Sequence, residues 1–236
     1  MAKENKVSSK IIAAARKLKI FDDSFVLILA ALVGLTGGYA AIAFRYLINY
    51  VTVLMGIMCE YTSFGIQYSA LYISKILPFY HSKGIAAFTE LQFVYIFLIP
   101  IIGLMLVAFI TNVFAKEAKG HGVPEVMSAV TRKGGIIRPR IVLLKMFVSA
   151  ITIGSGGSVG REGPIVHIGS AMGSVFGQFF KISSSAVTVL VGCGAAAGIS
   201  ATFNAPIAGT LFASEVILRD IRITSVSPIL ISSLVA

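Results

Sequence analysis

The chain has 236 residues, of which 56% are hydrophobic and only 13% are charged. A soluble domain has about 45–50% apolar and about 25% charged residues, so this composition argues against a soluble protein. The net charge of +10 could suit a nucleic-acid-binding protein, but the basic residues are placed between apolar runs, as membrane proteins place them. We therefore expect an integral membrane protein that binds no nucleic acid.

Three apolar runs are long enough to cross a bilayer, for which about 20 helical residues suffice. Residues 91–115 and 182–214 contain no Asp, Glu, Lys or Arg, and residues 25–58 contain a single basic residue. The N-terminal run begins too late and is too long for a cleavable signal peptide. The two cysteines, Cys59 and Cys193, indicate neither a disulfide framework nor a thiolate metal site.

The basic residues predict the orientation of the chain. Thirteen of them precede residue 25 or lie in residues 116–145, whereas the loop 59–90 has two. Because basic residues concentrate on the cytoplasmic side, we expect the N-terminus and residues 116–145 inside, and the loop 59–90 outside.

The first predicted elements are an amphipathic segment and a long span. Residues 8–20 mix apolar and basic positions, as in a helix that lies on the inner membrane surface. The capping residues Asp22, Asp23 and Ser24 predict a new helix that starts at Phe25. A continuous helix over the run 25–58 would be about 50 Å long, so we expect a steep tilt, or a break near the glycines at 34, 37 and 38.

The span at 91–115 is predicted to return the chain to the cytoplasm, with a bend at Pro100 and Gly103. Beyond Lys119, glycine and proline break the apolar sequence into short pieces. Lipid cannot hydrogen-bond loose backbone, so such breaks survive at membrane depth only where protein or a watery cavity surrounds them. Many transporters use broken helices to place helix ends at a central ion site.

The first interruption is Gly120-His121-Gly122-Val123-Pro124-Glu125. Proline suits the first helical position because its missing N–H is not needed there, and Glu125 then lies in the first turn. The unpaired amides of such a helix start can face an anion. For this motif taken alone, an ordinary helix N-terminus in a loop is the favoured interpretation.

The second interruption, residues 154–164, inserts Arg161 and Glu162 between two apolar stretches. Ionisable residues at membrane depth are costly and usually functional, and the surrounding glycines allow backbone amides to approach a bound ion. The alternative is that Arg161 and Glu162 pair at a water-exposed helix end. Neither a P-loop nor a dinucleotide fingerprint fits, because no Lys-Ser/Thr follows Gly160 and no strand-like run precedes it.

Further glycines predict close helix packing. Gly169, Gly173 and Gly177 recur every four residues on a predicted helix over 165–180. The segment 194–206 indicates close helix contact followed by a new helix at Pro206. His167 is interpreted as a packed or pore-facing polar residue, and no cluster of His, Asp or Glu has the spacing of a metal site.

Together these segments resemble the CLC chloride channel and transporter family. Residues 120–125 resemble its GSGIPE motif, residues 160–164 match GREGP, and residues 194–206 resemble GAAAGxxAxFNAP. The similarity spans about residues 25–236. It implies an all-α integral membrane fold of tilted and broken helices, in which residues 25–236 form the first of two inverted-topology repeats after a cytoplasmic amphipathic segment at 1–24, and the second repeat is absent.

The resemblance also implies a function in chloride transport, without enzymatic activity, cofactor or metal. Each subunit of a homodimer would hold its own anion pathway in the bilayer of the plasma (inner) membrane, as a multi-pass protein with a cytoplasmic N-terminus. Glu162 would be the external gate, whose carboxylate occupies an anion site until it is protonated or displaced. The expected anion-binding residues are Gly120, His121, Gly122, Val123, Pro124, Gly160, Arg161 and Gly163.

Two positions depart from the family pattern. His121 stands where many members have serine, which leaves the anion open: fluoride or nitrate are alternatives to chloride. Val216 stands where proton-coupled members have a second glutamate, directly after the position of Glu215. Since valine cannot titrate, this favours a channel, with chloride/proton antiport as the alternative and a non-transporting scaffold or membrane-embedded enzyme as further ones. The second-half ligands of the family are absent, so this polypeptide alone is not expected to form a complete pore.

Overall fold

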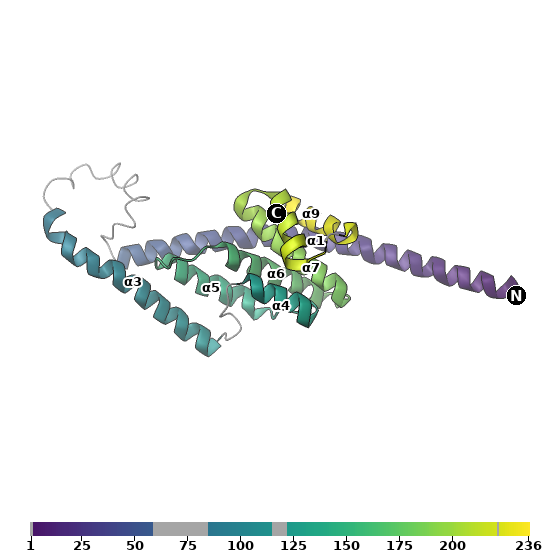
Figure 1. The fold of residues 1–236 in the computed structure, drawn as a ribbon, viewed down its shortest axis with the longest axis horizontal. Helices are drawn as coiled ribbons and strands as arrows, with labels where there is room; N and C mark the ends of the chain where they lie inside the picture. Colours follow the sequence, from purple (N-terminus) through teal and green to yellow (C-terminus); the bar gives the residue numbers. More distant parts are fainter. Residues whose placement is uncertain (1, 59–84, 115–121, 221) are drawn as a thin grey trace. The chain divides into compact units, whose positions relative to one another are not determined.

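The computed structural model describes residues 2–58, 85–114, 122–220 and 222–236, and every regular element in these ranges is a helix (Figure 1). The segment η3 is a π-helix that continues directly from α8. In chain order the elements are α1 (Ala2–Met58), α3 (Ile85–Phe114), α4 (Val123–Lys133), α5 (Arg140–Gly154), α6 (Glu162–Phe179), α7 (Ser184–Phe203), α8 (Pro206–Phe212), η3 (Ala213–Leu218) and α9 (Ile223–Val235).

Contacts divide the chain into two compact units. The first unit comprises Met1–Ile42, Gly120–Val142 and Glu162–Ala236, and the second comprises Ala43–Lys119 and Leu143–Arg161. The first unit therefore contains most of the predicted site residues.

The helix α1 differs from its prediction. It continues past the expected caps at residues 22–24 and through the glycines at 34–38, so a separate helix starting at Phe25 was wrong, as was a break at these glycines. The glycines serve packing instead: a Cβ on Gly34 would collide with the Ser232 carbonyl oxygen, and one on Gly38 would lie 2.6 Å from the Ala236 carbonyl oxygen. These glycines let α1 and α9 approach closely.

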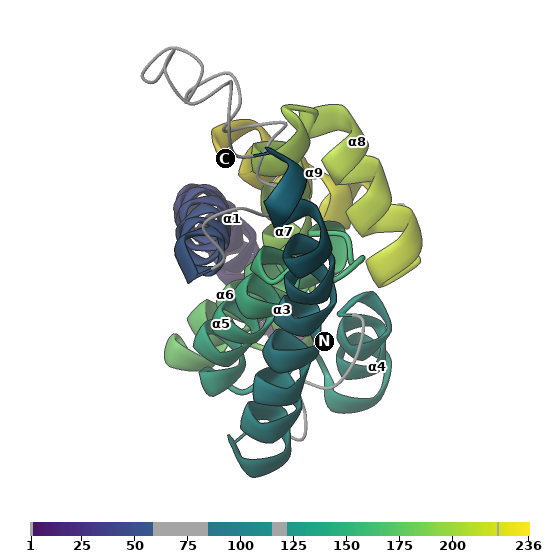
Figure 2. The ribbon, with the colours of Figure 1, turned by 90° about the vertical axis from the view of Figure 1, so that its left-hand side faces the viewer.

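The helices α6 and α7 form the centre of the first unit and lie side by side (Figures 1 and 2). A Cβ on Gly169 would collide with the Gly194 carbonyl oxygen. A Cβ on Gly194 would likewise collide with the Gly169 carbonyl oxygen. One turn along, a Cβ on Gly173 would collide with the Leu190 carbonyl oxygen. The predicted close packing is confirmed, and it is the small-residue contact by which apolar helices associate without a hydrophobic driving force.

Serine hydroxyls join α7, α8 and α9, which Figure 2 shows next to one another. The Ser200 hydroxyl donates to the Ser233 carbonyl oxygen at 2.6 Å, and the Ser233 hydroxyl donates to that of Pro206 at 2.7 Å. The Ser232 hydroxyl donates to the Cys193 carbonyl oxygen at 3.0 Å. These bonds cross between helices and involve no charged group.

A buried serine on α6 fixes the loop between α4 and α5. The Ser174 hydroxyl donates to the Gly135 carbonyl oxygen at 2.6 Å and accepts the Ile137 N–H at 2.8 Å. It also accepts a hydrogen bond of 2.9 Å from Gln178 Nε2, which donates to the Ile137 carbonyl oxygen as well. A hydroxyl has one donor and two acceptor sites, so that of Ser174 is saturated.

Replacing this hydroxyl is expected to lower stability. In Ser174→Ala the Ile137 N–H loses its acceptor and the Gly135 carbonyl loses its donor, which costs about 1–3 kcal/mol for an unsatisfied buried group. The thermal unfolding midpoint of the detergent-solubilised full-length protein should therefore decrease by several degrees. An unchanged midpoint would contradict the structural role of Ser174.

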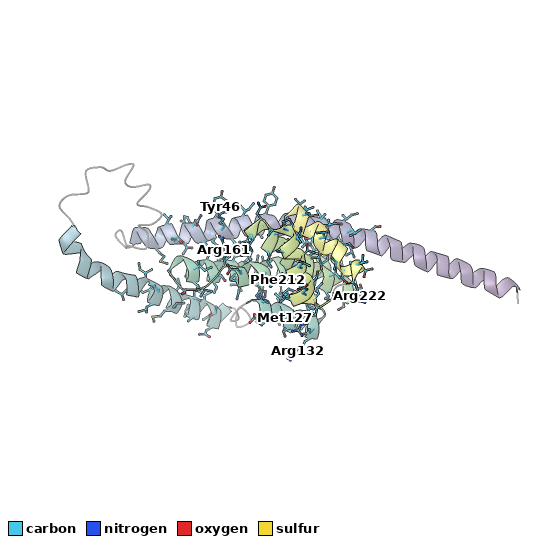
Figure 3. All side chains as sticks on the ribbon, turned by 45° about the horizontal axis from the view of Figure 1, so that its top comes forward. Tyr46, Met127, Arg132, Arg161, Phe212 and Arg222 are labelled. Atoms are coloured by element: carbon cyan, nitrogen blue, oxygen red, sulfur yellow. The ribbon has the colours of Figure 1, made fainter. Side chains whose placement is uncertain are left out.

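Within the described residues, two helical segments are long and apolar enough to cross a membrane, Ser24–Met55 and Ser184–Phe203, and shorter apolar helices lie at Leu98–Val113, Pro206–Leu218 and Ile223–Val235. Large apolar side chains are exposed along α1, including Tyr39, Tyr46 and Tyr50, of which Tyr46 is labelled in Figure 3. Exposed apolar surface of this kind suits a lipid environment.

The second unit combines the C-terminal part of α1 with α3 and α5. A Cβ on Gly154 at the end of α5 would lie 2.7 Å from Val51 Cγ1 of α1, and a Cβ on Gly103 of α3 would collide with the Ser155 hydroxyl. The helix α3 continues through Pro100 as one element. Close contacts at glycine are thus common to both units.

Candidate anion-binding site

The helix α6 begins at Glu162, as the Gly163-Pro164 pair predicts. Glu162 is exposed, whereas residues 164–171 are buried. Because Pro164 has no N–H, the first-turn amides without an acceptor inside α6 are those of Glu162 and Gly163. The Glu162 carboxylate is therefore attached to the end of α6 that favours negative charge.

The helix α4 begins in a similar way. Gly122 precedes it with a φ of 100°, a conformation that favours glycine. The Gly122 N–H donates to Glu125 Oε2 at 2.7 Å. Pro124 has no N–H, so the amides of Val123 and Glu125 are the first-turn donors without an acceptor inside α4.

Sequence reasoning did not foresee the bond between Gly122 and Glu125. The sequence did contain a signal for it. In a capping box, an acidic residue three positions after the N-cap accepts a hydrogen bond from the backbone N–H of the N-cap residue. This bond occupies the Gly122 N–H, one of the amides that the sequence offered to an anion, and it places a carboxylate at the same helix end.

The starts of α4 and α6 meet. A Cβ on Gly122 would collide with the Gly163 carbonyl oxygen and would lie 3.4 Å from His167 Cβ. We call the contact of Gly122, Gly163 and His167 the α4/α6 junction. The junction brings together residues of two sequence motifs that lie about 40 positions apart in the chain. One of these residues, Gly163, directly follows Glu162.

The third motif supports this junction from α7. A Cβ on Gly198 would lie 2.9 Å from the carbonyl oxygen of Ile165 in the first turn of α6. The helix α7 then ends at Asn204 with a φ of 54°, and α8 begins at Pro206 as predicted. The segment 194–206 thus holds α6 in place, as expected from its interpretation as a segment of close helix contact.

The structure does not test the positions of the other four predicted ligands at this junction. Gly160 and Arg161 belong to the second unit, and both are exposed. Gly120 and His121 lie outside the residues that the structure describes. The structure therefore brings Gly122, Val123, Pro124 and Gly163 together with Glu162, and leaves the roles of the other four as predictions.

A charged pair outside the site lies just before α9. Arg222, labelled in Figure 3, contacts Asp220 with 2.7 Å between Nη2 and Oδ2. The side-chain hydrogen bonds from Arg222 lower the pKa of Asp220 to about 2, and the Ser225 hydroxyl also donates to this carboxylate. Asp220 therefore stays ionised throughout the usual pH range.

Comparison with known proteins supports the motif assignment. Residues 103–236, more than half of the chain, match the family model of voltage-gated chloride channels. The chain belongs to this CLC family. Its relatives include a putative ClcB-like chloride channel protein of Ralstonia nicotianae, 28% identical over 215 residues that cover 89% of this chain and 45% of the relative. The H(+)/Cl(-) exchange transporter ClcA of Vibrio cholerae is 36% identical over 131 residues, which cover 54% of this chain and 28% of that protein.

Solved structures of the CLC family have the same fold. A slow cyanobacterial Cl⁻/H⁺ antiporter superposes with a TM-score of 0.65 at 22% identity, covering 89% of this chain and 44% of the antiporter. A CLC-type fluoride/proton antiporter superposes with a TM-score of 0.64 at 20% identity, covering 91% and 46%. The chain is an all-α CLC membrane fold that spans less than half the length of these relatives.

Proposed function

We propose that the protein containing this chain exchanges chloride for protons across a membrane, with Glu162 as the gate. The α4/α6 junction carries this proposal, because it gathers two helix N-termini next to Glu162, whose carboxylate is attached to the start of an apolar helix. Relatives named as H(+)/Cl(-) exchange transporters support exchange over the channel that Val216 favoured.

Physical chemistry explains why several helix ends are needed. Removing an anion from water costs on the order of tens of kcal/mol, whereas one helix terminus returns about 0.3–2 kcal/mol. A carboxylate is itself an anion, so Glu162 can compete with chloride for the same amides and leave when it takes a proton. In an exchanger this proton is transported in the opposite direction to the anion.

The other predicted roles complete this proposal. Gly120, His121, Gly160 and Arg161 would add anion contacts, and the protein would act as a homodimer whose subunits each hold a pathway. The basic residues support a cytoplasmic N-terminal segment at 1–24, with residues 25–236 as the first repeat. His121 instead of serine, together with the likeness to a fluoride/proton antiporter, makes fluoride a second candidate substrate.

The test is uphill proton transport. Full-length protein is reconstituted into liposomes with an outward chloride gradient and no proton gradient, and the internal pH is followed with a trapped dye. Chloride efflux should drive protons inward until the interior is more acidic than the bath. Repeating the measurement with fluoride or nitrate gradients identifies the preferred anion.

The alternatives give different results. If chloride leaves the liposomes without any proton movement, and still does so when a proton gradient opposes exchange, the protein is a channel. Anion flux no faster than in empty liposomes, for all three anions, indicates a scaffold and contradicts the proposed transport function.

A further inference from the structure

The helix α6 carries buried polar side chains below its first turn. His167 is 2% exposed, and both Ser170 and Ser174 are 0% exposed. Among the residues whose exposure the structure describes, His167 is the one buried side chain of the Asp, Glu and His types. An ionisable residue at membrane depth indicates function, and imidazole is the side chain that gains and loses a proton near neutral pH.

His167 is the buried member of the α4/α6 junction, one turn into α6. It follows Gly163 by four residues, or about one helical turn, and its Cβ lies close to Gly122. It follows Glu162 by five residues, which is about 7.5 Å along the axis of α6. Positions five apart differ by about 140° around a helix, and Glu162 is exposed whereas His167 is buried, so a proton that passes between them needs a chain of water molecules.

Ser170 provides a place for such a water. It lies three residues after His167, and side chains at this spacing are neighbours on a helix. Its hydroxyl is buried and has no hydrogen-bond partner among the described residues. Buried polar groups normally bond to protein or to ordered water, so this hydroxyl is suited to hold a water next to His167. Ser174, one turn further, is saturated by protein groups.

Two carboxylates lie on the helices that meet at His167. On α4, the Glu125 carboxylate accepts the Gly122 N–H at the same junction, while Arg132 and Lys133 lie at the opposite end of that helix. On α6 itself, Glu162 lies in the first turn. The helix α7 contains no Asp, Glu, Lys, Arg or His, and its one titratable group is the Cys193 thiol.

We propose that His167 holds the transported proton between the C-terminal part of α6 and Glu162, supplying the titratable group that is missing at the position of Val216. This inference rests on the proposed exchange function. The neutral imidazole accepts a proton at one ring nitrogen from water held by Ser170. The imidazolium releases a proton from its other nitrogen through water to the Glu162 carboxylate. The imidazole returns to its neutral form, and one proton has moved without any other reactant.

The test compares proton and chloride rates in liposomes containing the full-length protein. His167→Gln keeps hydrogen-bonding groups but cannot carry a proton, so proton transport should fall at least about tenfold while chloride transport continues. His167→Glu restores a titratable group and should recover part of the proton transport.

Ser170 and Ser174 provide a matched pair of variants on the same helix. Ser170→Ala removes a hydroxyl without a protein partner, so it should slow protons relative to chloride without lowering the unfolding midpoint. Ser174→Ala should lower the midpoint and keep the proton-to-chloride ratio of the wild type.

Two results would overturn the proposal, and they are distinguishable. A wild-type ratio in both His167→Gln and Ser170→Ala, in a protein that exchanges normally, would exclude His167 as the proton carrier and leave the exchange function intact. A wild-type protein that moves chloride without protons would overturn the exchange function together with this role.

Discussion

Gly194→Val is expected to prevent the chain from folding. A Cβ at this position collides with the backbone carbonyl of Gly169. A Cβ on Gly169 would in turn collide with the backbone carbonyl of Gly194. Neither contact involves a flexible side chain that could move away. The helices α6 and α7 would have to separate, which also opens the contacts at Gly173 and Gly198. Overpacking of a core costs about 1–3 kcal/mol when side chains can adjust, so we expect a larger loss here.

The measurement is the yield of monodisperse full-length protein after detergent extraction, which should fall to background. The control is Ser185→Val, which introduces the same side chain at an exposed position in the first turn of α7. Exposed substitutions usually change stability by no more than about 0.5 kcal/mol. Wild-type yield and unfolding midpoint in Gly194→Val would show that α6 and α7 do not pack through these glycines.

Glu162→Gln is expected to abolish proton transport while chloride still moves. Glutamine has nearly the same shape as glutamate but neither competes with an anion for the amides of the α4/α6 junction nor carries a proton. Proton flux should fall by about 100-fold or more, and chloride flux should lose its dependence on pH. Both rates are measured in the same liposomes, with a pH dye and a chloride electrode.

Glu215→Gln is the matched control for this variant. It makes the same substitution at an exposed carboxylate on η3, away from the first turn of α6. Coupled exchange should persist in this variant. Proton transport at the wild-type rate in Glu162→Gln would remove the gate role from Glu162, whatever the fold.

Local sequence predicted the places where helices begin. Proline lies in the first turn of α4, α6 and α8, because proline both suits the first turn and cannot continue a preceding helix. The motifs around these starts also identified the family. These helix starts and motifs depend only on residues that are neighbours in the chain, so they can be predicted from the sequence.

Features that depend on distant partners were not predictable. Glycine favours both a helix break and a close helix contact, and only the approach of α9 decides that Gly34 and Gly38 serve contact. Ser170 and Ser174 are the same residue one turn apart on one helix. The Gly135–Ile137 loop saturates the second hydroxyl, whereas the first has no protein partner among the described residues.

The hydrogen bonds between α7, α8 and α9 involve no charged group, and this has a consequence for the protein at low pH. Their donors are serine hydroxyls and their acceptors are backbone carbonyls, and neither type titrates between about pH 2 and pH 12. Salt screens charged pairs but has little effect on such dipolar links. These hydrogen bonds between α7, α8 and α9 thus do not depend on the hydrogen-ion concentration, so a change of pH that acts on the proposed gate would leave them intact.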